Sequence, residues 1–276
     1  MSQARSPTYL DLIFVSRSKK VLFSESFRPL NLDTIEQDLN ASNQPILEAS
    51  ALVEYLATAP EKVILVDNTS SLDIAQQYPA FLRKGVSIVT PNKKGFSDNY
   101  DLWEDMFAAA SNGSGNGGYL FHESTVGAGL PVLSTLKELV ETGDEITKIE
   151  GVFSGTMSFL FNSFMPVGGG GGSFAAEVKK AKDLGYTEPD PRDDLNGLDV
   201  ARKLTILARL AGLKIQNPTS FPVQSLIPKE LESCSSGDEF MSRLPEFDDQ
   251  MEKLKQEAAN EGKVVRFVGS IDVASQ

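Results

Sequence analysis

The sequence contains very few of the residues that form disulfides and metal clusters. Its 276 residues include one cysteine, Cys234, and one histidine, His122. A single cysteine cannot close a disulfide within the chain, and one histidine beside it cannot complete a zinc site of the usual Cys and His type. The sequence therefore excludes a disulfide-stapled scaffold and a zinc-cluster protein.

Basic residues and long apolar runs are scarce as well. The 26 Lys and Arg residues stand against 38 Asp and Glu, and the net charge of −12 would repel the phosphates of a nucleic acid. No segment approaches the roughly 18 consecutive apolar residues of a membrane-spanning helix. Residues 1–14 also lack the apolar core and cleavage site of a secretory signal. We therefore predict a cytoplasmic protein that binds neither nucleic acid nor a membrane.

The first half of the chain alternates between two kinds of pattern. Short runs rich in Val, Ile and aromatic residues, typical of buried strands, occupy residues 10–15, 62–67, 86–90 and 119–123. Apolar residues at helical spacing occupy residues 46–59, 71–83 and 100–110. Strands separated by helices predict an α/β fold with a mostly parallel sheet, whose ligands lie at the carboxyl ends of the strands. The loops that follow three of these strands, and that we therefore expect to bind a ligand, are residues 67–70, 90–94 and 123–129.

The pattern changes at about Leu130, and the second half mixes helices with isolated strands. Helices are predicted over residues 130–142, 159–164, 174–184, 199–213 and 248–260, and strands over residues 146–153 and 264–273. The glycine tract at residues 168–172 is predicted to be a surface loop. This mixture of helices and isolated strands predicts a second domain of α+β type.

Two glycine-rich loops are candidates for nucleotide binding. Gly113, Gly115 and Gly118 fit the spacing G-x-G-x-x-G, but a helix precedes them and a strand follows, which is the reverse of the order that phosphate binding requires. We therefore interpret them as a linker. Gly127 and Gly129 do lie between a strand and a helix, although Val132 occupies the place of the third glycine.

Residues 185–203 form the densest polar passage, with five acids between Glu188 and Asp199. One interpretation is a helix start, with Asp193 or Asp194 as the cap. A second starts from Asp199 and Lys203, which are four residues apart and share one face of a helix. They could form a surface ion pair, or project into a cleft beside Glu188, where carboxylates would hold a substrate ammonium and the lysine would move a proton.

Several segments together resemble the homoserine dehydrogenase family in its short fungal form. They are residues 66–71, 90–94, 122–129, 153–156, 185–203 and 218–228. The resemblance implies an incomplete Rossmann-type NAD(P)-binding domain over residues 1–129, without its first βα unit. An α+β substrate and dimerisation domain would cover residues 130–276 without the family's C-terminal end. It further implies interconversion of L-homoserine and L-aspartate 4-semialdehyde in threonine and methionine biosynthesis, by a homodimer.

The resemblance also implies roles for individual residues. Lys203 matches the family's proton donor, and Lys93 matches the lysine beside it, close to both cofactor and substrate. The positions implied for the substrate are Glu188, Asp199, Asp194, Gly155 and Thr156. Those implied for the nucleotide are Thr69, Ser70, Lys93 and Gly185. The backbone carbonyls of Glu123, Val126, Ala128 and Leu130 match the ligands of a structural sodium ion.

Three questions stay open at this stage. Arg17 and Lys19 follow the first predicted strand, where an acidic residue would favour NAD, so NADP is permitted and Arg17 could meet its 2′-phosphate. His122 is a rival for acid–base work, but a lone histidine on a strand favours a structural role. Because the family's first glycine turn and its C-terminal end are missing, the alternative to an enzyme is a catalytically silent fragment that dimerises or binds a ligand.

Overall fold

The computed structural model describes residues 9–110 and 117–273, which form two compact units. The first unit comprises Met1–Val66, Gln76–Val89 and Ala108–Leu120, and the second comprises Asp67–Ala75, Thr90–Phe107 and Phe121–Gln276. The chain passes between them several times, and the predicted division after Gly129 stays a prediction. In the part of the chain that the structure describes, no helix is long and apolar enough to cross a membrane.

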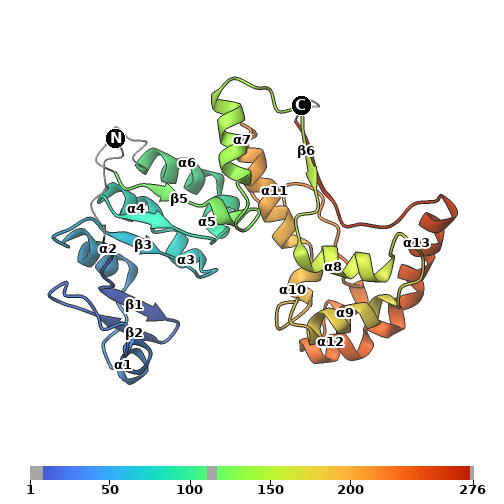
Figure 1. Ribbon diagram of the computed structural model, residues 1–276, viewed down its shortest axis with the longest axis horizontal. Coiled ribbons are helices and arrows are strands. Elements are labelled where there is room, and N and C mark those ends of the chain that lie inside the picture. Colours follow the sequence, from blue (N-terminus) through green and yellow to red (C-terminus); the bar gives the residue numbers. More distant parts are fainter. Residues whose placement is uncertain (1–8, 111–116, 274–276) are drawn as a thin grey trace, which may run out of the picture. The chain divides into compact units, whose positions relative to one another are not determined.

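A parallel sheet of three strands forms the centre of the α/β part (Figure 1). Its order is β3 (Ile64–Val66), β4 (Ser87–Val89) and β5 (Leu120–Phe121). Strands β3 and β4 pair in parallel. Ile88 N donates to Tyr119 O, and Thr90 N donates to Phe121 O. Because the residue numbers increase in the same direction along both strands, β4 and β5 are also parallel. The predicted α/β fold with a mostly parallel sheet is confirmed.

The strand predicted over residues 10–15 is placed differently. Strand β1 (Phe14–Arg17) pairs antiparallel with β2 (Lys20–Phe23), in a hairpin closed by two residues. Phe14 lies opposite Phe23, and both rings pack around Tyr55 of helix α2 (Ala49–Ala57). Helix α1 (Ile35–Ala41) contacts β2. Two short apolar runs around a two-residue turn are typical of a hairpin, and the prediction missed this signal.

The helix predicted over residues 71–83 is interrupted. The structure has α3 (Leu72–Ala75) and then α4 (Tyr78–Arg83), with Pro79 in the first turn of α4. A proline in mid-helix would clash with the carbonyl four residues earlier, here that of Ala75, whereas it fits the first turn of a new helix. Helix α4 packs on α2 and β4, with Phe81 and Leu82 fully buried.

Gly118 has a packing role rather than a phosphate-binding one. Its N–H donates to Leu82 O at 2.8 Å, and a Cβ at this position would collide with the carbonyl of Val86. Gly113 and Gly115, the other glycines of that pattern, lie outside the described residues. We expect Gly118→Ala to lower the free energy of unfolding by about 1–3 kcal/mol, the usual cost of overpacking a core. Urea denaturation would measure this loss; an unchanged midpoint would contradict the packing role.

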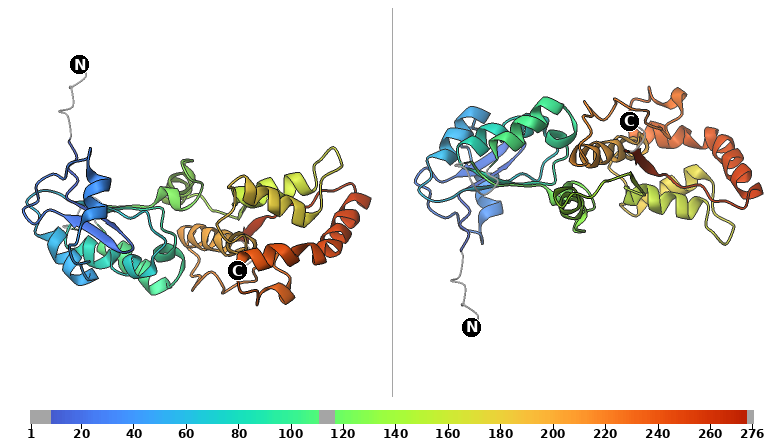
Figure 2. Two further views of the ribbon diagram at one scale, coloured as in Figure 1. Left: turned by 90° about the horizontal axis from the view of Figure 1, so that it is seen from below. Right: turned by 90° about the horizontal axis from the view of Figure 1, so that it is seen from above.

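The second unit is mainly helical (Figures 1 and 2). Besides α3 and the end of β5, its elements are α5 (Lys94–Ser97), α6 (Tyr100–Ala109, ending in the first unit), η1 (Glu123–Thr125), α7 (Val132–Glu141), β6 (Lys148–Gly151), α8 (Gly155–Phe164), α9 (Phe174–Asp183), α10 (Arg192–Leu195), α11 (Leu198–Leu210), η2 (Lys229–Leu231), α12 (Gly237–Arg243), η3 (Leu244–Phe247), α13 (Asp248–Asn260) and β7 (Gly269–Asp272). Strands β6 and β7 pair antiparallel. Helix α11 contacts α5, α7 and β7, so it connects the parts that carry the candidate site.

An aromatic and aliphatic core holds the helices of this unit together. Phe161 and Phe164 of α8 pack against Phe174 of α9, and Phe240 of α12 is fully buried in the same cluster. Ser154 caps α8 by accepting from Met157 N, and Ser173 caps α9 by accepting from Ala176 N. The N-terminal ends of α8 and α9 are therefore fixed by their own sequences as well as by the core.

Candidate functional site

The loops at the carboxyl ends of β3 and β4 meet, as the parallel sheet predicts. Asn92 Nδ2 donates to Asp67 Oδ2 at 3.1 Å and to Ser71 O at 2.8 Å, and Thr90 Oγ1 donates to Asp67 O at 2.7 Å. Asp67, Thr90 and Asn92 are all buried. A buried polar network with its bonds satisfied is rigid, so it fixes the backbone from which Lys93 projects.

Two lysines share one carboxylate at the centre of the site. Lys93, at the N-terminal end of α5, places its Nζ 3.2 Å from Asp199 Oδ1. Lys203 places its Nζ 2.6 Å from Asp199 Oδ2 and donates to Phe153 O at 2.7 Å. Asp199 and Lys203 lie one turn apart on α11, as their spacing predicted. The structure thus joins Lys93 to a residue 106 positions later in the chain.

The charges of the two lysines dominate the electrostatics of Asp199. Burial alone would raise the pKa of Asp199, but the charges of Lys203 and Lys93 and their hydrogen bonds outweigh it, so the pKa is lowered. The side chain of Lys203 is only 16% exposed, against 28% for Lys93 and 41% for Asp199. The ionised carboxylate of Asp199 therefore binds the amine of Lys203, which is partly desolvated, and the Phe153 carbonyl also orients this amine.

A second network surrounds Asp194. Its Oδ1 accepts from Thr156 Oγ1 at 3.0 Å, and its Oδ2 accepts from Glu188 N at 2.8 Å. Tyr186 O lies 2.7 Å from the same Oγ1, so the single proton of this hydroxyl is shared between Asp194 and Tyr186 O. Asp194 therefore fixes the 186–188 backbone against the first turn of α8. The same segment of chain carries the Phe153 carbonyl that Lys203 contacts, so the two networks meet at residues 153–156.

The helix-start interpretation of this passage is right about the acidic first turn and wrong about the cap: Asp193 and Asp194 lie in the first turn of α10, whose N-cap is Pro191. Neither Asp193 nor Asp194 caps α11, whose N-cap is Gly197 in the left-handed conformation (φ 74°). A Cβ on Gly197 would also press on Gln224 O, so a side chain could not stand there. The carboxylate of Asp194 binds Thr156 and the backbone of Glu188 instead, so Asp194 remains part of the candidate site.

Glu188 and Gly185 lie at the open side of this network. The carboxylate of Glu188 is exposed and makes no hydrogen bond or ion pair within residues 9–110 and 117–273. Gly185 is left-handed (φ 74°) with open space where a Cβ would be, and Gly155, at the start of α8, is also open. The backbone is thus accessible beside a carboxylate that could receive a cation.

The remaining nucleotide candidates lie in both units. Thr69 N donates to Asp67 Oδ1, and Thr69 Oγ1 accepts from Ser71 N, so the loop that carries exposed Ser70 is ordered by local bonds. Arg17 lies in β1 of the first unit and forms an exposed ion pair with Glu36 at 3.5 Å.

The predicted sodium loop contains a tight turn. Gly127 (φ 83°) and Ala128 (φ 53°) are consecutive residues with positive φ, and Leu130 N donates to Gly127 O at 2.9 Å, which closes the turn. The carbonyl of Leu130 accepts from Val132 N at 2.8 Å. The side chain of Glu123 is used elsewhere, because its carboxylate accepts from the first backbone N–H groups of α7, those of Leu133 and Ser134.

His122 lies in an aromatic cluster. Its ring stacks on Phe96 at 4.2 Å between centroids and meets the edges of Trp103 and Phe107. Burial and the charge of Lys137 lower the pKa of His122 to about 4, so the imidazole is neutral at working pH. These contacts support the structural interpretation of this histidine.

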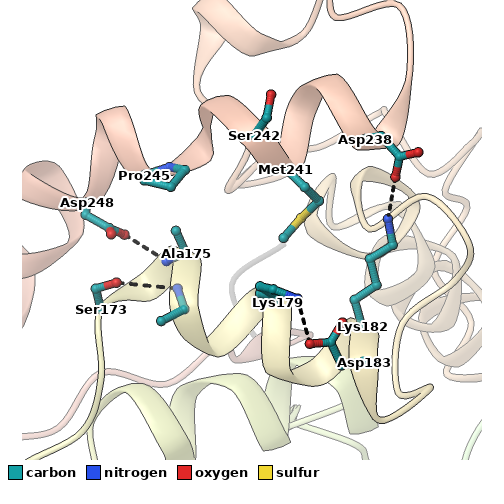
Figure 3. A pocket seen from close by; sticks show the side chains of 11 residues that line it. Ser173, Ala175, Lys179, Lys182, Asp183, Asp238, Met241, Ser242, Pro245 and Asp248 are labelled. Atoms are coloured by element: carbon teal, nitrogen blue, oxygen red, sulfur yellow. Dashed lines mark hydrogen bonds and ion pairs between the residues drawn. The ribbon is translucent and has the colours of Figure 1, made fainter.

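A cavity of about 550 Å³ lies elsewhere in the second unit, between α9 and the α12–η3 segment (Figure 3). None of the predicted site residues lines it. Its charged groups are occupied with partners: Lys182 pairs with Asp238, Lys179 pairs with Asp183, and Asp248 accepts from Ala175 N. The cavity therefore offers a ligand no free charge at these positions.

Sequence reasoning missed two groups of the site. The Phe153 carbonyl, which accepts from Lys203, has no signal of its own in a sequence. Asn92 lies within the predicted loop at residues 90–94 without a role of its own there, although an asparagine directly after a buried strand and a proline is a signal for a backbone-binding amide.

Comparisons with known proteins agree with this geometry. The family models for the homoserine dehydrogenase NAD binding domain and for homoserine dehydrogenase match residues 5–117 and 131–276. The homoserine dehydrogenase of Emericella nidulans is 56% identical over 99% of this chain and 76% of its own length. A crystal structure of a Candida auris protein of unknown function has a TM-score of 0.88 and 45% identity, covering 98% of this chain and 75% of that one.

A more distant structure shares the fold alone. It is a hyperthermophilic archaeal homoserine dehydrogenase in complex with NADPH, with a TM-score of 0.55 and 23% identity over 72% of this chain and 59% of that one. The two family matches together cover most of the chain, and the Emericella relative is similar over nearly all of it. On these grounds, the chain belongs to the homoserine dehydrogenase family.

Proposed function

We propose that this chain is an NAD(P)-dependent oxidoreductase that interconverts L-homoserine and L-aspartate 4-semialdehyde. The observation that carries the proposal is the shared carboxylate: Asp199 holds Lys203 and Lys93 at 2.6 and 3.2 Å. Such a chain of charges can hold one lysine ready to exchange a proton while the other stabilises negative charge. Membership of the family supports the choice of reaction.

The chemistry divides between the protein and a nicotinamide nucleotide. The nucleotide, when bound, exchanges a hydride with the carbon that bears the hydroxyl group of homoserine. The ammonium of Lys203 gives a proton to the developing alkoxide during reduction, and its neutral amine takes the hydroxyl proton during oxidation. The Phe153 carbonyl and Asp199 hold its Nζ in one place, so that little reorganisation is needed at the moment of transfer.

The substrate is held by the second network in this proposal. The free carboxylate of Glu188 receives the substrate ammonium, and Asp194 holds the backbone of Glu188 through its N–H. Gly155 and Thr156 form the wall beside it at the start of α8. A charge-assisted bond to an ammonium would fix the amino acid in one orientation.

The residues present fit a nucleotide at the carboxyl ends of the strands. Thr69, Ser70 and Gly185 provide exposed hydroxyl groups and an open, left-handed backbone. Lys93 would face both ligands, and Arg17 would meet the 2′-phosphate of NADP. The archaeal relative was solved with NADPH, which supports NADP, with NAD as the alternative.

We extend the proposal to three features that rest mainly on the family resemblance. A sodium ion would be bound by the carbonyls of Glu123, Val126, Ala128 and Leu130, and the tight turn at residues 127–130 supports such a loop. A homodimer would form through the domain at residues 130–276, where Val152 and Val268 are about half exposed near the β6–β7 sheet. The proposed reaction would belong to threonine and methionine biosynthesis and would take place in the cytoplasm.

Nucleotide binding and turnover test the function together. Calorimetry with NADPH and NADH on the purified chain would be followed by homoserine-dependent reduction of NADP and NAD. Micromolar binding with turnover is the expected result. A folded chain that binds neither nucleotide would contradict the proposal and would fit the silent fragment instead.

Replacing Glu188 tests the substrate site. We expect Glu188→Gln to raise the KM for homoserine by roughly 10-fold, because one charge-assisted bond is worth about 1.5 kcal/mol or more. The KM for the nucleotide should hardly change. Asp193→Asn, which removes an exposed acid from the same passage, is the matched control and should leave the KM for homoserine unchanged. Equal changes in both variants would point to general electrostatics instead of a contact.

A further inference from the structure

The position of Lys93 depends on a very short helix. Helix α5 has four residues, and Lys93 stands at its N-terminal end. A helix of this length has no stability of its own, so tertiary contacts must hold it. Lys93 O accepts from Phe96 N, Ser97 N and Ser97 Oγ, which ties the residue to the rest of α5. Whatever holds the far end of α5 therefore also sets the place of Lys93.

Arg209 holds that far end. Its Nη1 donates to Phe96 O at 2.6 Å and its Nη2 donates to Asp98 O at 2.8 Å. The same guanidinium donates to Ile215 O and Gln216 O, both at 3.0 Å, in the segment after α11. The planar fork thus binds four carbonyls from two segments, which the single nitrogen of a lysine cannot do.

The guanidinium is buried between aromatic rings. Arg209 is 5% exposed, and its Cζ lies 5.4 Å from the ring centre of Tyr100 and 5.7 Å from that of Trp103. Burial lowers the pKa of Arg209 to about 10, so the side chain still carries its charge at neutral pH. A buried charge is costly unless hydrogen bonds compensate it. Within the described residues, the carbonyls and rings that compensate this charge belong to α5 and the residue after it, to α6, and to the segment after α11.

The two ends of α5 are thus attached to one helix. Lys93 meets Asp199 near the start of α11, and Phe96 and Asp98 meet Arg209 ten residues later, about 15 Å along the helix axis. We propose that Arg209 is a positioning residue: it attaches α5 to α11 so that Lys93 stays in reach of the carboxylate it shares with Lys203. This role in turnover rests on the proposed function, whereas the attachment itself does not.

A double-mutant cycle tests the role in turnover. We expect Arg209→Lys to lower kcat for homoserine oxidation by about 10-fold, the scale of a small misplacement of a reacting group. In a Lys93→Ala background the same change should have almost no further effect, because the group it positions is gone. Equal losses in both backgrounds would overturn the proposal, since a purely structural role would lower activity regardless of Lys93.

A chemical test needs no activity. Competitive acetylation by acetic anhydride, read by peptide mass spectrometry, measures how well each lysine is shielded. Arg209→Lys should make Lys93 several-fold more reactive and leave Lys203 nearly unchanged, because Lys203 is held by Asp199 of its own helix and by Phe153 O. Asp199→Asn is the positive control and should expose both lysines. Unchanged reactivity of Lys93 would overturn the proposal.

Arg266→Lys is the matched control for an arginine that binds carbonyls. Its Nη1 donates to Phe161 O and Met165 O at the end of α8, far along the chain from α5. This variant should leave the reactivity of Lys93 unchanged. If Arg209→Lys does not fold, Arg209→Gln, which keeps two donors without the charge, takes its place in both tests. A wild-type chain without turnover would overturn the function alone, because acetylation still decides whether Arg209 positions Lys93.

Discussion

Lys203→Met lowers kcat for homoserine oxidation by about 10² to 10⁴-fold, the range expected for loss of a general acid–base group. The amine of Lys203 is the group that Asp199 and the Phe153 carbonyl both hold. Methionine keeps most of the apolar stem, so the packing of α11 should survive. Steady-state kinetics with NADP and homoserine would measure the loss, and calorimetry would show nucleotide binding nearly unchanged.

The matched control for this variant is Lys179→Met. Lys179 also forms an ion pair four residues apart on a helix, with Asp183 at 2.7 Å, but on the exposed face of α9. Such pairs contribute only about 0.3–0.5 kcal/mol, and the control should leave kcat unchanged. If Lys203→Met kept more than a tenth of the activity, the pair of Asp199 and Lys203 would be an ordinary helix ion pair, and the proton would need another carrier.

The sequence predicted those parts of the site that follow from regular structure. Because parallel strands end at the same edge of a sheet, the loops after β3 and β4 could be expected to meet, and Asn92 does bind Asp67. Asp199 and Lys203 could be placed on one face by their spacing alone. The resemblance then joined these pieces to Lys93 and Glu188 without showing how they touch.

Other contacts were beyond prediction because they depend on tertiary packing. Lys93 meets Asp199, and Arg209 meets Phe96 over a separation of 113 residues, only because α5 packs against α11. No periodicity encodes that pairing. The hairpin of β1 and β2 shows the opposite case, since its turn signal was present and only the assumption of a parallel strand concealed it. Asp194 was misread as a cap because capping is decided by local backbone, whereas its partners come from α8 and the 186–188 segment.

Acidification from pH 7 to pH 4.5 is expected to destabilise the chain through His122. The folded pKa of His122 is about 4, against 6.5 for a free imidazole. Between these values the unfolded chain binds the proton and the folded chain does not, so stability falls as the pH falls from 6.5 toward 4. At about 1.4 kcal/mol for each pKa unit, the ceiling is about 3 kcal/mol, of which about 2 kcal/mol is lost between pH 7 and pH 4.5.

Urea denaturation at a series of pH values, compared with His122→Phe, isolates this effect. Phenylalanine can stack on Phe96 and meet Trp103 as the imidazole does, but it cannot take a proton. The lowered pKa values of Asp190, Asp199, Glu150 and Glu239 contribute stability that is lost as the pH falls through and below their ordinary values of 3.8 and 4.5, so mostly below this window. The variant should therefore lose most of the dependence on pH between 7 and 4.5. If its slope matched that of the wild type, the imidazole would have to be solvated in the folded chain, and its burial among the three aromatic rings would be wrong.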